Sequence, residues 1–340
     1  MGVEASVGQT NIETFIAQSL RYVLHSYPNL FPYMQELAGF DKETFKHSIC
    51  VAETAVRSFI KYANGCRLPQ DQVKRGIVTL SLGGFLHDMG KAGIERYSLE
   101  DSFKALRPEE QRSISAHIIL PGQDTRTADE RAVIHNHPTI GGYMLRNLFD
   151  SLDIPKDIAE DVFDFAFSHH EKPADLIATH NSYSRLSLIR KNPKDALLHV
   201  FLTLSDIAVS MREPRSYRNN SSLPYEVIFD ELNTELSHDL LNAIFGTIPH
   251  VDALRKKMIG YVMSSIHEID TVLTQKEYDV EGIWINGSEW HSTPAEHAVL
   301  IPALVKKVWN NKNHVRRLMD FLALDGGTRW RHESRIRPPY

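Results

Sequence analysis

The sequence predicts an all-α protein, a bundle of helices followed by a small C-terminal appendage, and three observations favour this fold. Apolar residues recur at steps of three and four over most of residues 41–275, which is the spacing of a buried helix face. The clearest strand-like run, residues 282–287, lies beyond that region and ends in an Asn-Gly pair typical of a β-hairpin turn. The composition is 42% hydrophobic and 24% charged, which supports a full core and excludes a disordered chain.

Each predicted helix is based on its own apolar stripe. The first helix follows Asp41, and its stripe consists of Phe45, Ile49, Ala52, Val56, Phe59 and Ala63. The second carries Val73, Ile77, Leu80 and Gly84, and we expect it to end at Gly90. The remaining stripes predict a helix from near Thr127 to Leu148, one that begins at Ile154-Pro155, one from about Pro193 to Met211, and two over about 224–246 and 249–275.

These elements divide the chain into three predicted regions. Residues 1–40 form a short helical lead-in, and residues 41–275 form the helical domain. Residues 276–340 form the appendage, whose hairpin signal is followed by a tail rich in Lys and Arg. The appendage offers a surface for a protein partner, while the oligomeric state stays open.

Charge and cysteine content restrict the partners and the compartment. The 38 Lys and Arg residues are balanced by 43 Asp and Glu residues, so bulk charge gives no argument for nucleic acid or membrane binding. No apolar stretch reaches the ~18–20 residues that a transmembrane helix needs, and no secretory signal is visible. Two cysteines exclude a disulfide framework, so we expect a cytoplasmic protein.

Several ionisable side chains lie on the apolar stripes, where burial is costly unless the groups are paired or bind a metal. The chain has 17 histidines, and five predicted helices each carry a histidine or an aspartate on or beside the buried face. The candidate metal ligands are His47, His87, Asp88, His137, His169, His170 and Asp206, and Glu43 lies four residues before His47 on the same side of its helix. A set of imidazoles and carboxylates without thiolates suits Fe, Mn, Co, Ni or Zn and disfavours a structural zinc site.

The candidate ligands also suggest phosphoryl chemistry. A carboxylate such as Asp88 can bridge two cations, and two cations ~3.5–4 Å apart can activate a water for phosphoryl displacement. Lys91 is three residues beyond Asp88, where its ammonium group could contact a phosphate oxygen or simply interact with the negative end of the helix dipole.

The ordered set of motifs resembles the HD superfamily of metal-dependent phosphohydrolases, and specifically its HD-GYP branch. The resemblance covers about residues 41–220. The matching motifs are Lys46-His47-Ser48, His87-Asp88-Met89-Gly90-Lys91, Asn136-His137-Pro138, His169-His170-Glu171 and Ser205-Asp206-Ile207. The resemblance implies an HD-domain helical bundle in which these His and Asp residues bind the metals and Glu43 binds a third metal or orients His47. It also implies that Arg215 and Arg218 clamp substrate phosphates, as guanidinium groups do well.

This sequence departs from the branch in two places. The Gly-Tyr-Pro triplet that names it is absent, because Lys172-Pro173-Ala174-Asp175 follows Glu171. The stretch between Lys91 and His137 is about twenty residues longer than usual, so His117 competes with His137 for the His-Pro ligand position. The Pro138 and Gly141 context favours His137, and we expect residues 99–119 to be an inserted helix that covers the site.

The resemblance therefore implies a signalling phosphodiesterase that hydrolyses a cyclic dinucleotide, first of all cyclic di-GMP, through a metal-bridging hydroxide. In this reading Asp88 and Lys91 are catalytic, and Lys91, Arg215 and Arg218 bind substrate. We expect two or three divalent transition metals, with Fe or Mn as the first candidates. Three alternatives remain open: a phosphohydrolase for another nucleotide or phosphate ester, a non-catalytic cyclic-dinucleotide sensor, and a di-iron oxygenase.

Overall fold

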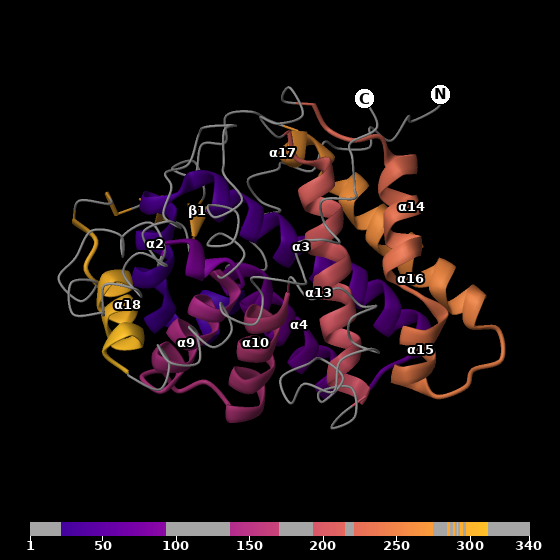
Figure 1. The fold of residues 1–340 in the computed structure, drawn as a ribbon, viewed down its shortest axis with the longest axis horizontal. Helices are drawn as coiled ribbons and strands as arrows, with labels where there is room; N and C mark the ends of the chain where they lie inside the picture. The colour runs from indigo at the N-terminus through magenta and orange to yellow at the C-terminus, as the bar shows by residue number, and fades with distance from the viewer. Residues whose placement is uncertain are drawn as a thin grey trace, which may run out of the picture.

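The computed structural model describes residues 22–92, 137–169, 193–214 and 221–274, together with most of 284–311. In this part of the chain the protein is a bundle of α-helices, which confirms the predicted fold class (Figure 1). None of the described helices combines the length and the apolar character that crossing a membrane requires.

The longest described helix, α3 (Lys42–Cys66), forms the centre of the bundle. It packs against α4 (Gln70–Leu86), α13 (Pro193–Arg212) and α16 (Val251–Glu268). Asp41 starts α3 by accepting hydrogen bonds from the first backbone N–H groups of the helix, as an N-cap residue does. The whole stripe predicted for this helix is buried: Phe45, Ile49, Ala52, Val56, Phe59 and Ala63.

Two further helices close one side of the core. Helices α9 (His137–Phe149) and α10 (Lys156–Ser168) pack against each other, and α10 also packs against α4. Pro155 is the N-cap of α10, in agreement with the predicted start of that helix at Ile154-Pro155. The start predicted for α9 near Thr127 lies outside the described residues.

The second helix ends earlier than predicted, and this matters for the site. Helix α4 ends at Leu86 rather than at Gly90, and residues 87 and 88 form a turn before the chain is helical again over 89–92. The turn places His87 and Asp88 at the end of the helix instead of within it.

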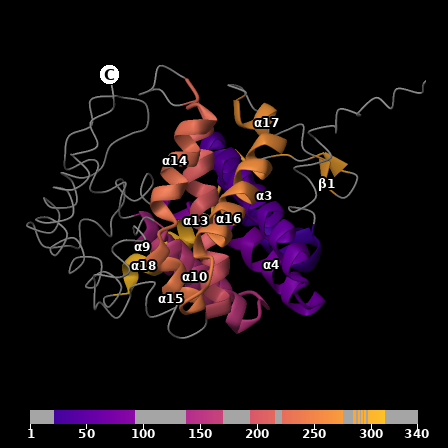
Figure 2. The ribbon, with the colours of Figure 1, turned by 90° about the vertical axis from the view of Figure 1, so that its right-hand side faces the viewer.

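The two helices predicted over 224–246 and 249–275 are each interrupted. The first divides into α14 (Tyr225–Glu235) and α15 (His238–Phe245), because the side chain of Ser237 accepts a hydrogen bond from the Leu240 N–H and starts a new helix. The second divides into α16 and α17 (Asp270–Thr274). Helices α14 and α16 lie side by side against α13 (Figure 2).

The C-terminal segment contains the predicted hairpin and one helix. Strands β1 (Trp284–Ile285) and β2 (Ser288–Glu289) pair antiparallel, which confirms the hairpin signal. Helix α18 (Leu300–Asn310) packs against α9 and against α2 (Phe31–Phe40), which follows the short 3-10 helix η1 (Pro28–Leu30) (Figure 1).

A buried carboxylate joins α18 to α2. Glu36 on α2 accepts hydrogen bonds of 2.8–2.9 Å from the backbone N–H groups of Val299, Leu300 and Ile301. These groups begin α18 and have no partner within the helix, so the carboxylate stabilises the helix start.

Candidate metal centre

Two glycines permit close contacts of α4 and the segment after it with α3 and α9 at the centre of the bundle. A Cβ atom on Gly84 would lie 2.4 Å from the Cα of Ala52, so glycine permits the close contact of α4 with α3. A Cβ atom on Gly90 would lie 1.9 Å from the carbonyl oxygen of His137, so glycine likewise permits the approach of α9. The second contact places the Nε2 atom of His137 2.8 Å from Oδ1 of Asp88.

Two of the histidines are held by backbone carbonyls. The Nδ1 atom of His87 donates to the carbonyl oxygen of Gly84, and that of His169 donates to Ala166, each over 2.8 Å. A carbonyl oxygen can only accept, so Nδ1 carries the hydrogen in both rings. When these rings are neutral, each Nε2 atom therefore has a lone pair directed toward the centre of the cluster.

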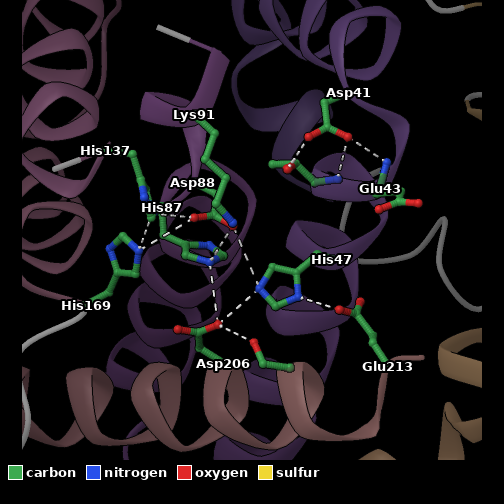
Figure 3. A network of polar contacts seen from close by, with 12 residues as sticks. Asp41, Glu43, His47, His87, Asp88, Lys91, His137, His169, Asp206 and Glu213 are labelled. Atoms are coloured by element: carbon green, nitrogen blue, oxygen red, sulfur yellow. Dashed lines mark hydrogen bonds and ion pairs between the residues drawn. The ribbon is translucent and has the colours of Figure 1, made fainter. Parts of the chain in front are cut away.

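These Nε2 atoms converge on Asp88, which is buried (Figure 3). The Nε2 atoms of His137 and His169 are 3.0 Å apart, and the Nε2 atom of His169 is 3.6 Å from Oδ1 of Asp88. The Nε2 atom of His87 is fully buried and makes no hydrogen bond within the described part of the chain. Its nearest carboxylate oxygens are Oδ2 of Asp88 at 3.6 Å and Oδ1 of Asp206 at 3.8 Å.

His47 on α3 lies between two carboxylates that come from the C-terminal half of α13 and the residue after it. Its Nε2 atom is 3.0 Å from Oδ1 of Asp206, and its Nδ1 atom is 3.0 Å from Oε2 of Glu213 (Figure 3). The same Nε2 atom is 3.9 Å from Oδ2 of Asp88, so His47 joins the cluster on the side opposite His169.

The cluster shifts the pKa values of its members in opposite directions. Burial alone would lower the pKa of His47, but Glu213 and Asp206 outweigh it and raise the pKa to about 9. Burial and the neighbouring imidazoles of His87 and His137 instead lower the pKa of His169 to about 4, against the pull of Asp88.

Both aspartates stay ionised in this environment. Burial would raise the pKa of Asp88, but Lys91, the imidazole of His87 and the hydrogen bond from His137 hold it well below its usual range. Burial would likewise raise the pKa of Asp206, and the hydrogen bond from His47 and the other imidazoles hold it low. Ionised carboxylates beside imidazole lone pairs are the donor set that divalent transition metals prefer.

Two overlapping groups in the cluster have the geometry to hold a metal ion. One consists of His47, His87 and Asp206, and the other of His87, Asp88 and His169, with the ligand atoms of each group within 4.8 Å of one another. His87 belongs to both groups, and its buried Nε2 atom is the one without a hydrogen bond among the described residues. Because an unpartnered buried polar atom is costly, this atom fits a metal ligand.

The structure brings most of the predicted site residues together. The residues that meet at the centre are His47, His87, Asp88, Lys91, His137, His169 and Asp206. Lys91 lies at the edge, with its Nζ atom 2.5 Å from Oδ2 of Asp88 and its side chain 32% exposed. His170, Arg215, Arg218, His117 and the predicted helix over 99–119 lie outside the described residues.

Glu43 does not take the place that the resemblance implies. Its side chain is exposed and lies apart from the cluster, beside the Asp41 cap (Figure 3). The carboxylate that contacts His47 belongs to Glu213, which the sequence analysis missed. Glu43 is four residues before His47 on the same helix, but Glu213 reaches His47 through the packing of α13 on α3, and no local spacing signals that contact.

Comparison with known protein families finds a match over the central part of the chain. Residues 44–182 match the HD domain. The matched segment contains His47, His87, Asp88, His137 and His169, and this supports assignment to the metal-dependent phosphohydrolases. Asp206 and Glu213 lie beyond the HD domain match, although both contact His47. Comparison with curated proteins and with solved structures finds no match.

Proposed function

We propose that this protein is a metal-dependent phosphodiesterase for a cyclic dinucleotide, with cyclic di-GMP as the first substrate to test. The observation that carries the proposal is the convergence of His47, His87 and His169 on the two carboxylates of Asp88 and Asp206. All three imidazoles present Nε2 to the same centre, which is how histidines bind metals in hydrolytic sites. The match to the HD domain supports the hydrolase class independently.

His47, His87, Asp88, His169 and Asp206 would hold the metals. His137 would complete the set through its contact with Asp88, and His170 belongs to it by sequence resemblance. Divalent metals bound there would act as Lewis acids and lower the pKa of a bound water, which provides a nucleophile at neutral pH. Both Fe and Mn suit a ligand set of imidazole and carboxylate groups.

The protein side chains have distinct tasks in this proposal. The low pKa of His169 keeps its imidazole neutral at physiological pH, so its lone pair is available. In the metal-free protein His47 carries a proton, and binding a metal at Nε2 requires that this proton leave. Lys91 is exposed enough at the edge of the cluster to move from Asp88 to a substrate phosphate and offset its charge.

The cyclic dinucleotide is supported by sequence resemblance alone. Arg215 and Arg218 follow α13 and match the family's phosphate-contacting loop. Two such arginines would bind a diester with two phosphates better than a monoester, because each guanidinium group can pair with a phosphate. The missing Gly-Tyr-Pro triplet predicts slow turnover, since it removes part of the loop that shapes the family's site.

A panel of nucleotides tests the proposal. Wild-type protein, Asp88→Asn and the double variant Arg215→Ala/Arg218→Ala would be assayed with cyclic di-GMP, other cyclic nucleotides and simple phosphate esters, in Mn²⁺ and in Fe²⁺. We expect the wild type to hydrolyse cyclic di-GMP and Asp88→Asn to be inactive. The double variant should keep its metals but bind cyclic di-GMP about 2–4 kcal/mol more weakly, as expected for two charge-assisted contacts that are not fully additive.

The outcomes separate the alternatives. Turnover of a different phosphate ester without any binding of cyclic di-GMP would retain the phosphohydrolase and reject the substrate. Tight binding of cyclic di-GMP without turnover in either metal would indicate a sensor. Consumption of dioxygen by the Fe²⁺ protein with no phosphate release would reject phosphoryl chemistry.

A further inference from the structure

The histidines of the cluster differ in what holds their Nδ1 atoms. His87 and His169 donate to backbone carbonyls one turn earlier on their own helices. His47 instead faces a carboxylate, Glu213, from a different part of the chain. Of these three anchors, the contact to His47 is therefore the one that a single side-chain substitution can remove.

Glu213 and Asp206 contact the two ring nitrogens of His47 from the same region, the C-terminal half of α13 and the residue after it. Glu213 follows the last residue of α13, and its N–H still bonds to the carbonyl oxygen of Val209, so the helical path continues to it. Asp206 is seven residues earlier, which is two helical turns, so the two carboxylates lie on one face of α13. They bracket the ring of His47, with Asp206 at Nε2 and Glu213 at Nδ1, each at 3.0 Å.

We propose that Glu213 is a positioning residue of the metal centre, which fixes the ring of His47 so that Nε2 faces the metal. This inference rests on the proposed function only in assuming that the cluster binds divalent metals. An ionised carboxylate accepts but does not donate hydrogen bonds, so it retains the hydrogen on Nδ1 and leaves Nε2 for the metal. A carboxylate partner also makes the imidazole a more basic ligand, which strengthens metal binding.

The contact is buried, so water cannot readily replace it. The side chains of His47 and Glu213 are 5% and 9% exposed. Loss of the carboxylate would leave the Nδ1–H of a buried ring without its acceptor, and the ring could then turn away from the centre. Glu43, which precedes His47 by one helical turn, has an exposed side chain and is not expected to compensate.

Metal affinity tests this proposal directly. Wild-type protein would be compared with Glu213→Ala, Glu213→Gln, Glu43→Ala and Glu36→Ala by competition for Mn²⁺ with a chromogenic chelator. We expect Glu213→Ala to bind Mn²⁺ about 10–100-fold more weakly, as loss of the hydrogen-bond partner of a metal-bound histidine typically does. Glu213→Gln should be intermediate, because its amide oxygen is a weaker acceptor at the same position.

Two variants serve as matched controls. Glu36→Ala removes another buried carboxylate, which caps α18, so it should lower stability and leave Mn²⁺ affinity unchanged. Glu43→Ala should also bind Mn²⁺ as the wild type does. A nuclear magnetic resonance experiment on the Zn²⁺-bound protein adds a second measurement: the Nδ1–H signal of His47 should be protected from solvent exchange in the wild type and lost in Glu213→Ala.

Wild-type affinity in Glu213→Ala would overturn the proposal, as would an equal loss of affinity in Glu36→Ala, which would reflect a weakened fold. Loss of affinity in Glu43→Ala alone would assign the role to Glu43. A wild type that binds no divalent metal would overturn the proposal together with the metal centre. A wild type that binds Mn²⁺ but hydrolyses no phosphate ester would overturn only the proposed function.

Discussion

Replacement of Gly84 by alanine should weaken the fold and the metal centre together. Gly84 lies where α4 crosses α3, and an added Cβ atom would lie 2.4 Å from the Cα, 2.6 Å from the N and 2.7 Å from the Cβ of Ala52. Ordinary contact begins at 3.4 Å, so the two helices must separate by about 1 Å. The obstacle includes backbone atoms, which no change of rotamer can move aside.

The expected loss follows from two opposing contributions. Overpacking of a core typically costs about 1–3 kcal/mol, and a backbone obstacle favours the upper end of that range. Alanine in place of glycine inside a helix gains about 1 kcal/mol. We therefore expect Gly84→Ala to lower the free energy of unfolding by about 2 kcal/mol. Metal affinity should fall as well, because α4 leads directly to His87 while α3 carries His47.

Denaturant unfolding of the metal-free protein measures the first effect, and chelator competition measures the second. Gly260→Ala is the matched control, since Gly260 lies within α16 and has no atom within 4 Å of the added Cβ. That variant should gain about 0.5–1 kcal/mol through the reduced freedom of its unfolded chain, with unchanged metal affinity. If Gly84→Ala is as stable as Gly260→Ala, the close crossing of α3 and α4 is not real.

Three further predictions concern the centre and the C-terminal segment. Asp88→Asn should lose at least one metal per chain, because an amide cannot bridge two cations as a carboxylate can. Lys91→Ala should keep the metals and lower turnover, so metal analysis and the phosphodiesterase assay separate the two variants. In the metal-free protein the stabilisation by His47 should be complete below its unfolded pKa of about 6.5 and be lost as pH rises through its folded pKa of about 9. Denaturant unfolding should therefore show that the free energy of unfolding falls across this pH range. A flat profile would contradict the two-carboxylate environment of His47. Glu36→Ala should destabilise the protein by about 1–3 kcal/mol in thermal or denaturant unfolding, because it leaves the first N–H groups of α18 without their acceptor; an unchanged midpoint would show that the cap contributes nothing.

The sequence predicted those parts of the site that depend on helical periodicity. His47, His137 and Asp206 were found because each interrupts or borders an apolar stripe, and a buried ionisable group needs a specific partner. The packing of the bundle then brings these residues from different helices to one point, as the shared apolar faces require. The resemblance to HD proteins supplied their order along the chain.

The parts that the sequence could not predict depend on tertiary contacts and on helix ends. Glu43 has the right spacing from His47, but spacing fixes only which side of α3 it occupies and not what packs there. Glu213 carries no local signal, because its partner is 166 residues away in sequence. Gly90 is a residue type that commonly ends a helix, yet α4 ends at Leu86. Close contacts of this segment with α3 and α9 constrain the path of the chain there.

The packing of α18 against α2 and α9 limits how far the protein can be truncated. Four apolar residues of α18, Ile301, Leu304, Val305 and Val308, are at most 3% exposed. Helix α9, against which α18 packs, carries His137, so the far end of the chain supports a helix that contributes to the centre. A truncated protein that stops at the end of the matched HD domain would lose this brace, along with Asp206 and Glu213. Expression vectors for functional work should therefore retain the chain at least through Asn311.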